Sequence, residues 1–110
     1  MPPEIPLQIW WAEIPWGKAD YERPVVFLGH RSDAELALVR IGSNSELRAD
    51  SDFLFKNTHA DFGATGLSTT SYAEARMLIL APERFRKQIG VIEGSLRDDF
   101  EYWLDSAVLR

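Results

Sequence analysis

The stretch Ile9–Leu28, IWWAEIPWGKADYERPVVFL, sets the architecture of this chain. Aromatic and β-branched residues fill Leu7–Ile14, and the proline that follows has no amide hydrogen with which to extend a strand ladder. A polar loop over 16–22 comes next, and Pro24 then opens the continuous apolar run Val25–Leu28, which is typical of a strand buried on both faces. The polar residues after this run predict its end. The stretch therefore predicts two strands joined by a hairpin-type loop.

The middle of the chain alternates apolar clusters with short polar turns. Leu36–Ile41 predicts a third strand, and the apolar piece Phe53–Phe55 predicts a short strand inside a long, weakly patterned loop over 47–68. Ser71–Leu80 fits a helix in its first half and a strand in its second, so periodicity alone leaves its structure open. Lys87–Ile92 predicts a further strand, broken by its glycine.

The carboxyl-terminal segment carries the clearest helix pattern. Ser95 can cap the first turn, and Asp98 stands three residues later, as in a capping box. Apolar residues then recur at helical spacing, at Phe100, Trp103, Leu104 and Ala107. Many short strands followed by one helix indicate a mainly β fold. We expect a small barrel with the helix packed across or beside it, in one domain that covers residues 1–110.

The composition excludes several classes of function. With 12 basic and 17 acidic residues the net charge is −5, which argues against broad electrostatic capture of nucleic acid, so any such contact is expected to be local. The absence of cysteine excludes disulfides, thiolate metal sites and cysteine nucleophiles. No metal site is expected, because His59 and Asp61 have no further histidine nearby. No membrane span or secretory signal is present, which predicts a cytoplasmic protein.

Three segments, in this order, resemble toxins of the MazF/PemK family. Trp11–Pro15 and then Arg23–Val26 are similar to the family's W-A-D-I-P strand and to its strand that begins R-P-V. Asp61–Leu67, with Ser71 after it, is similar to the family's D-F-A-A-T-G-L-x-x-x-S stretch. Ile89–Ile92 and the last helix are similar to the family's I-G-x-L strand and final helix. The resemblance spans nearly the whole chain.

This resemblance implies both a fold and an activity. It implies an SH3-like small barrel that forms a homodimer, belongs to a type II toxin–antitoxin system and is neutralised by a cognate antitoxin protein. It also implies a metal-independent endoribonuclease, without a cofactor, that cleaves single-stranded mRNA. In such enzymes the arginine before the proline, here Arg23, acts on the scissile phosphate. A Ser/Thr pair that closes a following strand assists, and that turn holds Gly42 and Ser43 in this chain.

The chemistry of these residues suits a phosphate site. A guanidinium presents forked donors to phosphate oxygens, and Arg23 can do so unless the neighbouring Asp20 or Glu22 binds it instead. Ser43 and Ser71 are candidates for the assisting hydroxyls, although each can satisfy nearby backbone groups instead. The further candidates for RNA contact are Trp16, which can stack on a base, Lys18, Ser45 and Arg76.

Two departures from the family pattern keep a second hypothesis open. Gly42 stands where active members carry threonine, which removes a hydroxyl from the expected site. The strand after Ser71 reads Met77–Leu80, where active relatives place a polar or acidic group. Together with the acidic balance of charge, these departures favour a catalytically degenerate barrel that acts as a protein- or RNA-binding module.

Overall fold

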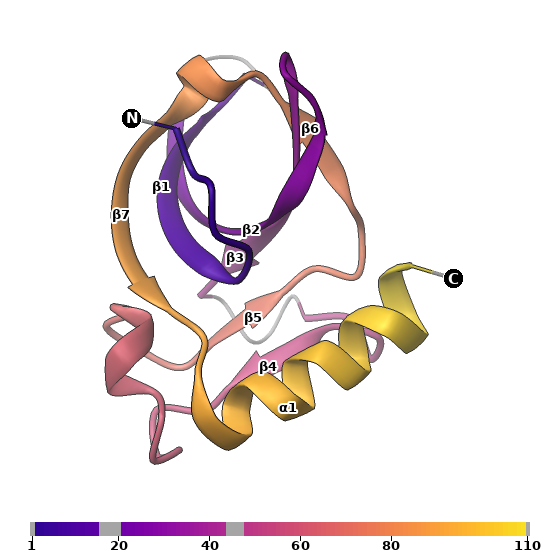
Figure 1. Cartoon of the computed structure of the whole chain (residues 1–110). Helices are drawn as coiled ribbons and strands as arrows, with labels where there is room; N and C mark the ends of the chain where they lie inside the picture. Colours follow the sequence, from indigo (N-terminus) through magenta and orange to yellow (C-terminus); the bar gives the residue numbers. More distant parts are fainter. Residues whose placement is uncertain (1, 16–20, 44–47, 110) are drawn as a thin grey trace.

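A computed structural model describes residues 2–15, 21–43 and 48–109 of the chain. Figure 1 shows a curled β-sheet with a helix beneath it. In chain order the elements are β1 (Gln8–Ile14), β2 (Tyr21–Ser32), β3 (Glu35–Gly42), β4 (Phe53–Phe55), the 3-10 turn η2 (Gly63–Thr65), β5 (Ser71–Ala73), β6 (Leu78–Leu80), the 3-10 turn η3 (Pro82–Arg84), β7 (Phe85–Val91), α1 (Gly94–Trp103) and the π-helical turn η4 (Leu104–Val108).

The strands form one antiparallel sheet that curls on itself. Its order is β4-β5-β3-β2-β1-β7, and β6 pairs with β3 beside this path. In Figure 1 the strands β1, β2, β3 and β7 curve around the upper half of the molecule, while α1 crosses below them beside β4. Among the described strands, β4 and β7 do not pair, so the curl is open. The predicted mainly β fold, barrel-like with a carboxyl-terminal helix, is confirmed.

Both faces of the central strands are buried, because neighbouring side chains enter two different cores. In β2, Val26 joins the core that lies against α1, while Val25 and Phe27 enter the core enclosed by the curl. The same alternation divides β3, where Val39 faces the first core and Leu38 the second. A strand buried on both faces needs apolar residues at every position, which explains the continuous apolar runs in the sequence.

The central strands are longer than the sequence predicted. The structure continues β2 from Tyr21 to Ser32, through the polar residues 29–33 that were expected to end it. The strand passes Gly29 at a φ of 148°, where the pairing with β3 shifts by a residue. Most side chains beyond this point are exposed, so polar residues are tolerated there. The prediction of a break was therefore wrong.

The segment left open between helix and strand consists of two short strands. β5 takes its first part and β6 its end, and the two pair with different portions of β3. Gly90 likewise does not interrupt the predicted last strand, because β7 runs through it from Phe85 to Val91. Long-range pairing decides both cases, and local propensity carries no information about it.

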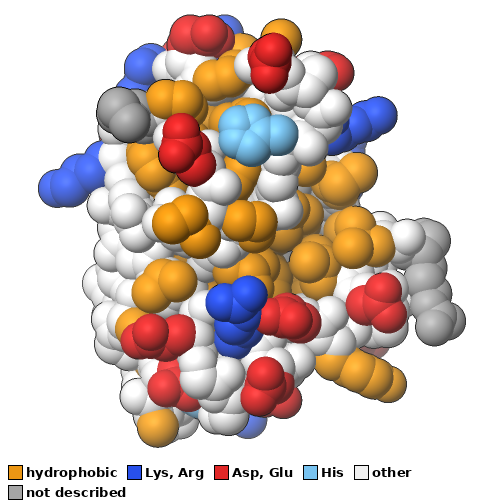
Figure 2. All heavy atoms as spheres, viewed as in Figure 1, with side chains coloured by type: hydrophobic (Ala, Val, Ile, Leu, Met, Phe, Trp, Pro, Cys, Tyr) orange, Lys and Arg blue, Asp and Glu red, His pale blue; other side chains and the backbone are white. Residues whose placement is uncertain are grey.

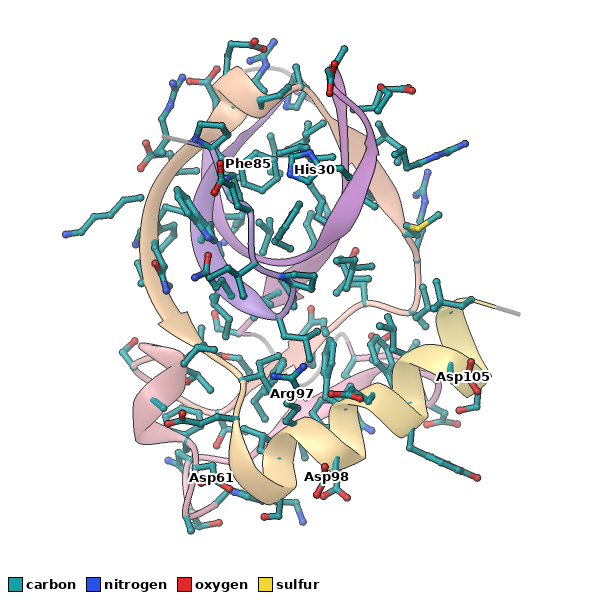
Figure 3. All side chains as sticks on the ribbon, viewed as in Figure 1. His30, Asp61, Phe85, Arg97, Asp98 and Asp105 are labelled. Carbon is teal, nitrogen blue, oxygen red and sulfur yellow. The ribbon has the colours of Figure 1, made fainter. Side chains whose placement is uncertain are left out.

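The cap of α1 comes from a distant loop. The prediction that Ser95 and Asp98 form a capping box is wrong, since the helix begins at Gly94 and its N-cap residue makes no side-chain cap bond. The Asp61 carboxylate accepts hydrogen bonds from the Leu96 backbone amide at 3.5 Å and the Ser95 hydroxyl at 3.3 Å. Figure 3 shows Asp61 beside the start of the helix. An acid from the loop before β5 thus satisfies the helix terminus.

The outward face of α1 is acidic. Asp98, Asp99 and Glu101 are exposed there, and Asp105 is exposed on η4, which continues the helix. Figure 2 shows red side chains around a blue one over the lower part of the molecule, where Figure 3 labels Arg97, Asp98 and Asp105. In the described part of the chain, no helix has the length and apolar character needed to cross a membrane.

Candidate functional site

A cleft of about 240 Å³ opens where several strand ends meet the loop before β5. Its lining comes from Trp11 of β1, residues 22–24 of β2, residues 41–43 at the end of β3, the loop 66–69, Ser71 of β5 and Ile89 of β7. The cleft therefore gathers residues from positions that span most of the chain. It also brings Arg23, Ser43 and Ser71 to the border of one depression, although the sequence nominated each separately.

Two glycines, one in the loop that lines the cleft and one in β7, let that loop lie against the strand. A Cβ on Gly66 would lie 2.0 Å from the Ile89 carbonyl oxygen, and Gly66 also adopts a φ of 74°. A Cβ on Gly90 would lie 2.1 Å from the Thr65 carbonyl oxygen. Only glycine permits backbones to approach so closely. The glycines of the two separate sequence motifs therefore meet each other in space, and we call this contact the glycine clasp.

Thr65 stabilises the loop above the clasp. Its side chain is fully buried, and its hydroxyl donates a 2.6 Å hydrogen bond to the Phe62 carbonyl. The same oxygen accepts a hydrogen bond from the Leu67 amide at 3.2 Å. A buried hydroxyl that is satisfied twice by its own loop fixes the backbone of that loop. Ser68 and Thr69, which come after Leu67, are exposed and line the cleft.

Ser71 and Ser43 occupy different environments. Ser71 is only 4% exposed, and its hydroxyl donates a 2.8 Å hydrogen bond to the Thr69 carbonyl. Ser43 is exposed and stands at the residue after β3. The hydroxyl proton of Ser71 is thus used in the hydrogen bond to Thr69, whereas Ser43 lies at the rim of the cleft, where a ligand can reach it.

Arg23 and Ser71 leave the sheet on opposite faces. Val25 pairs with Arg40, Arg23 and Gly42 are each two residues from that pair along their strands, and Gly42 pairs with Tyr72 of β5. Residues directly opposite each other share a face of the sheet, while consecutive residues of one strand alternate. The side chain of Arg23 is therefore on the face of Tyr72 and not on that of Ser71. Arg23 is exposed, and it has an interaction partner of its own.

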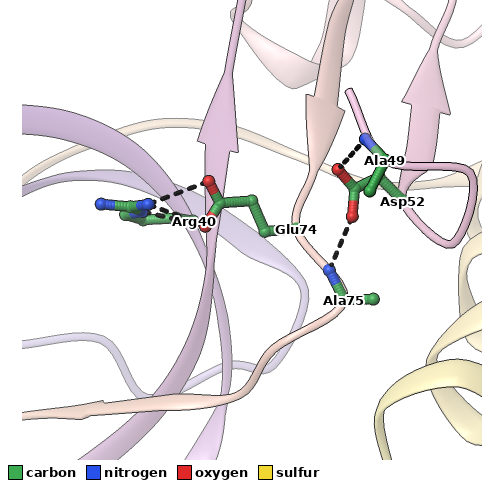
Figure 4. A network of polar contacts seen from close by, with 5 residues as sticks. All are labelled: Arg40, Ala49, Asp52, Glu74 and Ala75. Carbon is green, nitrogen blue, oxygen red and sulfur yellow. Dashed lines mark hydrogen bonds and ion pairs between the residues drawn. The ribbon is translucent and has the colours of Figure 1, made fainter. Parts of the chain in front are cut away.

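An ion pair on this face holds β5 against β3. Arg40 donates to both carboxylate oxygens of Glu74 at 2.9 Å, and the Glu74 amide donates to the Arg40 carbonyl at 2.9 Å. Figure 4 shows this pair beside Asp52, whose carboxylate accepts from the amides of Ala49 and Ala75, each at 3.1 Å. Glu74 and Asp52 together fix the chain on the carboxyl side of Tyr72.

The remaining sequence candidates fall outside the cleft or outside the described residues. Trp16, Lys18 and Ser45 belong to the segments 16–20 and 44–47, which the structure does not describe. Arg76 is exposed and does not line the cleft. The sequence reasoning passed over Trp11, which lines the cleft with 37% of its surface exposed. Nothing in the sequence marked this residue, because a tryptophan inside a predicted strand commonly packs in the core.

His59 and Asp61, which the sequence places two residues apart, have structural partners. The Asp61 amide donates a 3.0 Å hydrogen bond to Nδ1 of His59, so this nitrogen carries no proton in that contact. The approach of the Asp61 carboxylate to the same nitrogen at 3.9 Å is therefore not an ion pair. Among the described residues, no group of three side chains could hold a metal ion.

Comparisons with known proteins give a match in structure only. No family model matches the chain. No curated protein matches its sequence. A solved structure described as an endoribonuclease in complex with its cognate antitoxin, from mycobacterial species, superposes with a TM-score of 0.67 over 97% of this chain and 94% of that one, at 13% sequence identity. The chain therefore has the same fold as that endoribonuclease over nearly its entire length.

Proposed function

We propose that this protein is a toxin of a toxin–antitoxin system that cleaves single-stranded mRNA without a metal ion, and that the cleft is its active site. The observation that carries the proposal is the meeting of Arg23 and Ser43, chosen from separate sequence motifs, at one cleft. The fold shared with an endoribonuclease over 97% of the chain supports it.

The cleft residues suit binding of an RNA backbone. Arg23 neutralises charge on the scissile phosphate, and the exposed hydroxyl of Ser43 donates to a phosphate oxygen. Ser71 is a positioning residue in this scheme, because its hydroxyl holds the carbonyl of Thr69 and so shapes the cleft loop. The exposed ring of Trp11 offers a surface on which a base can stack. Trp16, Lys18, Ser45 and Arg76 stay predicted RNA contacts.

The reaction uses a nucleophile that the substrate itself carries. The ribose 2′-hydroxyl loses its proton to water or to the Glu22 carboxylate and attacks the adjacent phosphorus. The bond from phosphorus to the 5′ oxygen breaks, and that oxygen takes up a proton from solvent. The products are a 2′,3′-cyclic phosphate and a 5′-hydroxyl. Because Arg23 stabilises the crowded phosphate, no metal ion is required for this step.

Cleavage of a long single-stranded RNA in the presence of a chelator tests this activity. We expect discrete fragments with cyclic-phosphate ends, and a fall in rate on the order of 100-fold in Arg23→Ala. Arg31→Ala is the matched control, because Arg31 is also exposed on β2 but does not line the cleft. Equal rates for the two variants, or cleavage that stops with chelator, contradict the proposal.

The proposed partners are an antitoxin protein and a second copy of the chain in a cytoplasmic homodimer. The fold neighbour was solved with its cognate antitoxin, which supports the first partner. The mass of the purified protein by light scattering tests the dimer. Co-purification with the product of an adjacent small reading frame tests the antitoxin, and loss of RNA cleavage on adding that product is the expected result.

A binding module without catalysis is the second candidate, and Gly42 is the observation that favours it. Position 42 carries no hydroxyl, and a side chain there would collide with the ring of Tyr72. Such a protein binds RNA or a protein segment in the same cleft and releases no fragments. Binding of an uncleavable RNA by a folded protein that does not cleave the ribose form distinguishes it from the toxin.

A further inference from the structure

Lys87 is an exposed lysine of β7 whose charge has no partner in the described part of the chain. It makes no hydrogen bond or ion pair with a described residue. The neighbouring Arg84 and Arg86 differ, because they donate to the carboxylate of Glu13 at 2.5 and 2.6 Å. Of these three cations, Lys87 is therefore the one that no described carboxylate compensates, and its charge remains available to a ligand.

Strand pairing places Lys87 at the border of the cleft. Lys87 pairs with Trp11 of β1, which lines the cleft. Residues directly opposite each other in antiparallel strands share a face of the sheet, with Cβ atoms about 5 Å apart. Ile89, two residues further along β7, lies on the same face and also lines the cleft. The ammonium group, on its flexible four-carbon stem, can therefore reach a ligand that occupies the cleft.

A bulge in β7 keeps Lys87 on this face. Lys87 pairs with Trp11, and the next pair along the two strands is Phe85 with Ala12. One extra residue, Arg86, therefore stands in β7 at this point. Phe85 and Ala12 both enter the core enclosed by the curl. Without the extra residue, Lys87 would share the buried face of Phe85, since residues two apart in a regular strand point the same way.

The charge of the cleft itself does not attract a polyanion. Among the described residues that line it, Glu22 and Arg23 are charged, and their charges cancel. The chain as a whole carries a net charge of −5. Binding of a nucleic-acid backbone depends on cations that stand beside its phosphate groups. Lys87 supplies such a cation at the border of the cleft, beside the exposed ring of Trp11.

We propose that the ammonium group of Lys87 binds the RNA phosphate that flanks a base stacked on Trp11. This inference rests on the proposed function, because it assigns a second phosphate contact to the RNA held in the same cleft. β1, which carries Trp11, lies between β2 with Arg23 and β7 with Lys87. Cations on the strands at either side of a stacking ring suit a polymer in which phosphates alternate with bases. Lys87 binds the RNA and takes no part in the chemical step.

Binding of an uncleavable oligonucleotide at several salt concentrations tests this contact. A fluorescent single-stranded RNA with a methoxy group at every 2′ position has no nucleophile, and its anisotropy reports binding alone. We expect Lys87→Gln to raise the Kd about five-fold at low salt. We also expect it to lower the slope of log Kd against log salt concentration by about 0.7, the value for one phosphate contact on a single strand.

Arg31→Gln is the matched control, because it removes the same charge from an exposed position near the other end of β2, outside the described lining of the cleft. It is expected to leave the slope unchanged. Lys87→Arg retains the positive charge, so we expect the slope of the parent and a Kd within about two-fold of it. A Lys87→Arg variant that binds as weakly as Lys87→Gln overturns the contact.

The outcomes separate this inference from the proposed activity. A parent that binds the oligonucleotide but cleaves no RNA, with a lower slope in Lys87→Gln, removes the enzymatic proposal and supports the Lys87 contact. A parent that cleaves RNA, with equal slopes in Lys87→Gln and Arg31→Gln, overturns the contact and leaves the proposed function intact. A parent that neither cleaves nor binds removes both.

Discussion

The glycine clasp and the site around Gly42 are two crowded places with different obstacles. At Gly90 an added Cβ meets the backbone oxygen of Thr65 at 2.1 Å, and at Gly42 it meets the end of the Tyr72 ring at 2.7 Å. A backbone fixed by a buried threonine cannot retreat, whereas the end of a ring on a residue that is 8% exposed can tilt outward. The clasp therefore fixes the loop that lines the cleft, while the contact over Gly42 packs Tyr72 against the end of β3.

Filling the clasp has the largest expected effect on stability. Gly90→Ala forces a methyl group into the Thr65 backbone, and we expect a loss of about 3 kcal/mol in the free energy of unfolding. Urea denaturation measures it. Gly63→Ala is the control, because a Cβ at Gly63 meets no atom within 4 Å. Equal stability of the two variants contradicts the clasp.

The anchor of the same loop on α1 gives a smaller effect. Asp61→Ala removes the carboxylate that caps the helix, and the expected cost is about 1 kcal/mol. Asp98→Ala serves as the control, since Asp98 is exposed and no side chain caps the helix from within. Chemical denaturation of both variants decides the matter. A larger loss from Asp98→Ala restores the capping box that the sequence predicted.

Filling the space over Gly42 has a smaller expected effect on stability than filling the clasp. In Gly42→Ala the Tyr72 ring has to tilt away, at an expected cost of about 1 kcal/mol, well below that of Gly90→Ala. Urea denaturation measures this loss, with Gly63→Ala as reference. A loss as large as that of Gly90→Ala shows that the ring is held as rigidly as the backbone of Thr65.

The pH dependence of unfolding tests the ion pairs of Glu13, which lie outside both the glycine clasp and the site around Gly42. The Arg86 and Arg84 guanidinium groups, at 2.6 and 2.5 Å, hold the pKa of Glu13 below its ordinary value of 4.5, against the opposing effect of burial. A lowered carboxyl pKa contributes stability that is present above the ordinary value and disappears as pH falls through the folded-state pKa. We expect Glu13→Gln to lower the unfolding temperature slightly at pH 7.

At lower pH the unfolding temperatures of the parent and of Glu13→Gln are expected to converge. Once the Glu13 carboxyl is protonated in the parent as well, the ion pairs with Arg84 and Arg86 are lost in both. Calorimetry at pH 7 and at pH 3 checks this, and the difference between parent and variant is smaller at the lower value. A difference that grows on acidification contradicts the sign derived from the lowered pKa.

The sequence singled out some of the residues that line the cleft. Arg23 and Ser43 came from motifs and both line the cleft, because the chemistry of a guanidinium and of a hydroxyl depends on the residue type alone. The contact between Tyr72 and Gly42 was not predicted. The segment around Tyr72 fits a helix as well as a strand, so it gave no reason to pair the two residues. They lie thirty residues apart in the sequence, and only strand pairing connects them.

The sequence by itself determined where apolar runs become strands, where the last helix lies and which residue types can bind phosphate, because these properties depend on each residue and its neighbours. The tertiary structure decided which residues meet. It joined the glycines of two motifs in one clasp, gave α1 its cap from Asp61, and put Arg23 on the face of Tyr72 and away from Ser71. Register is the physical reason, since a shift of one residue exchanges every side chain between the two faces of a sheet.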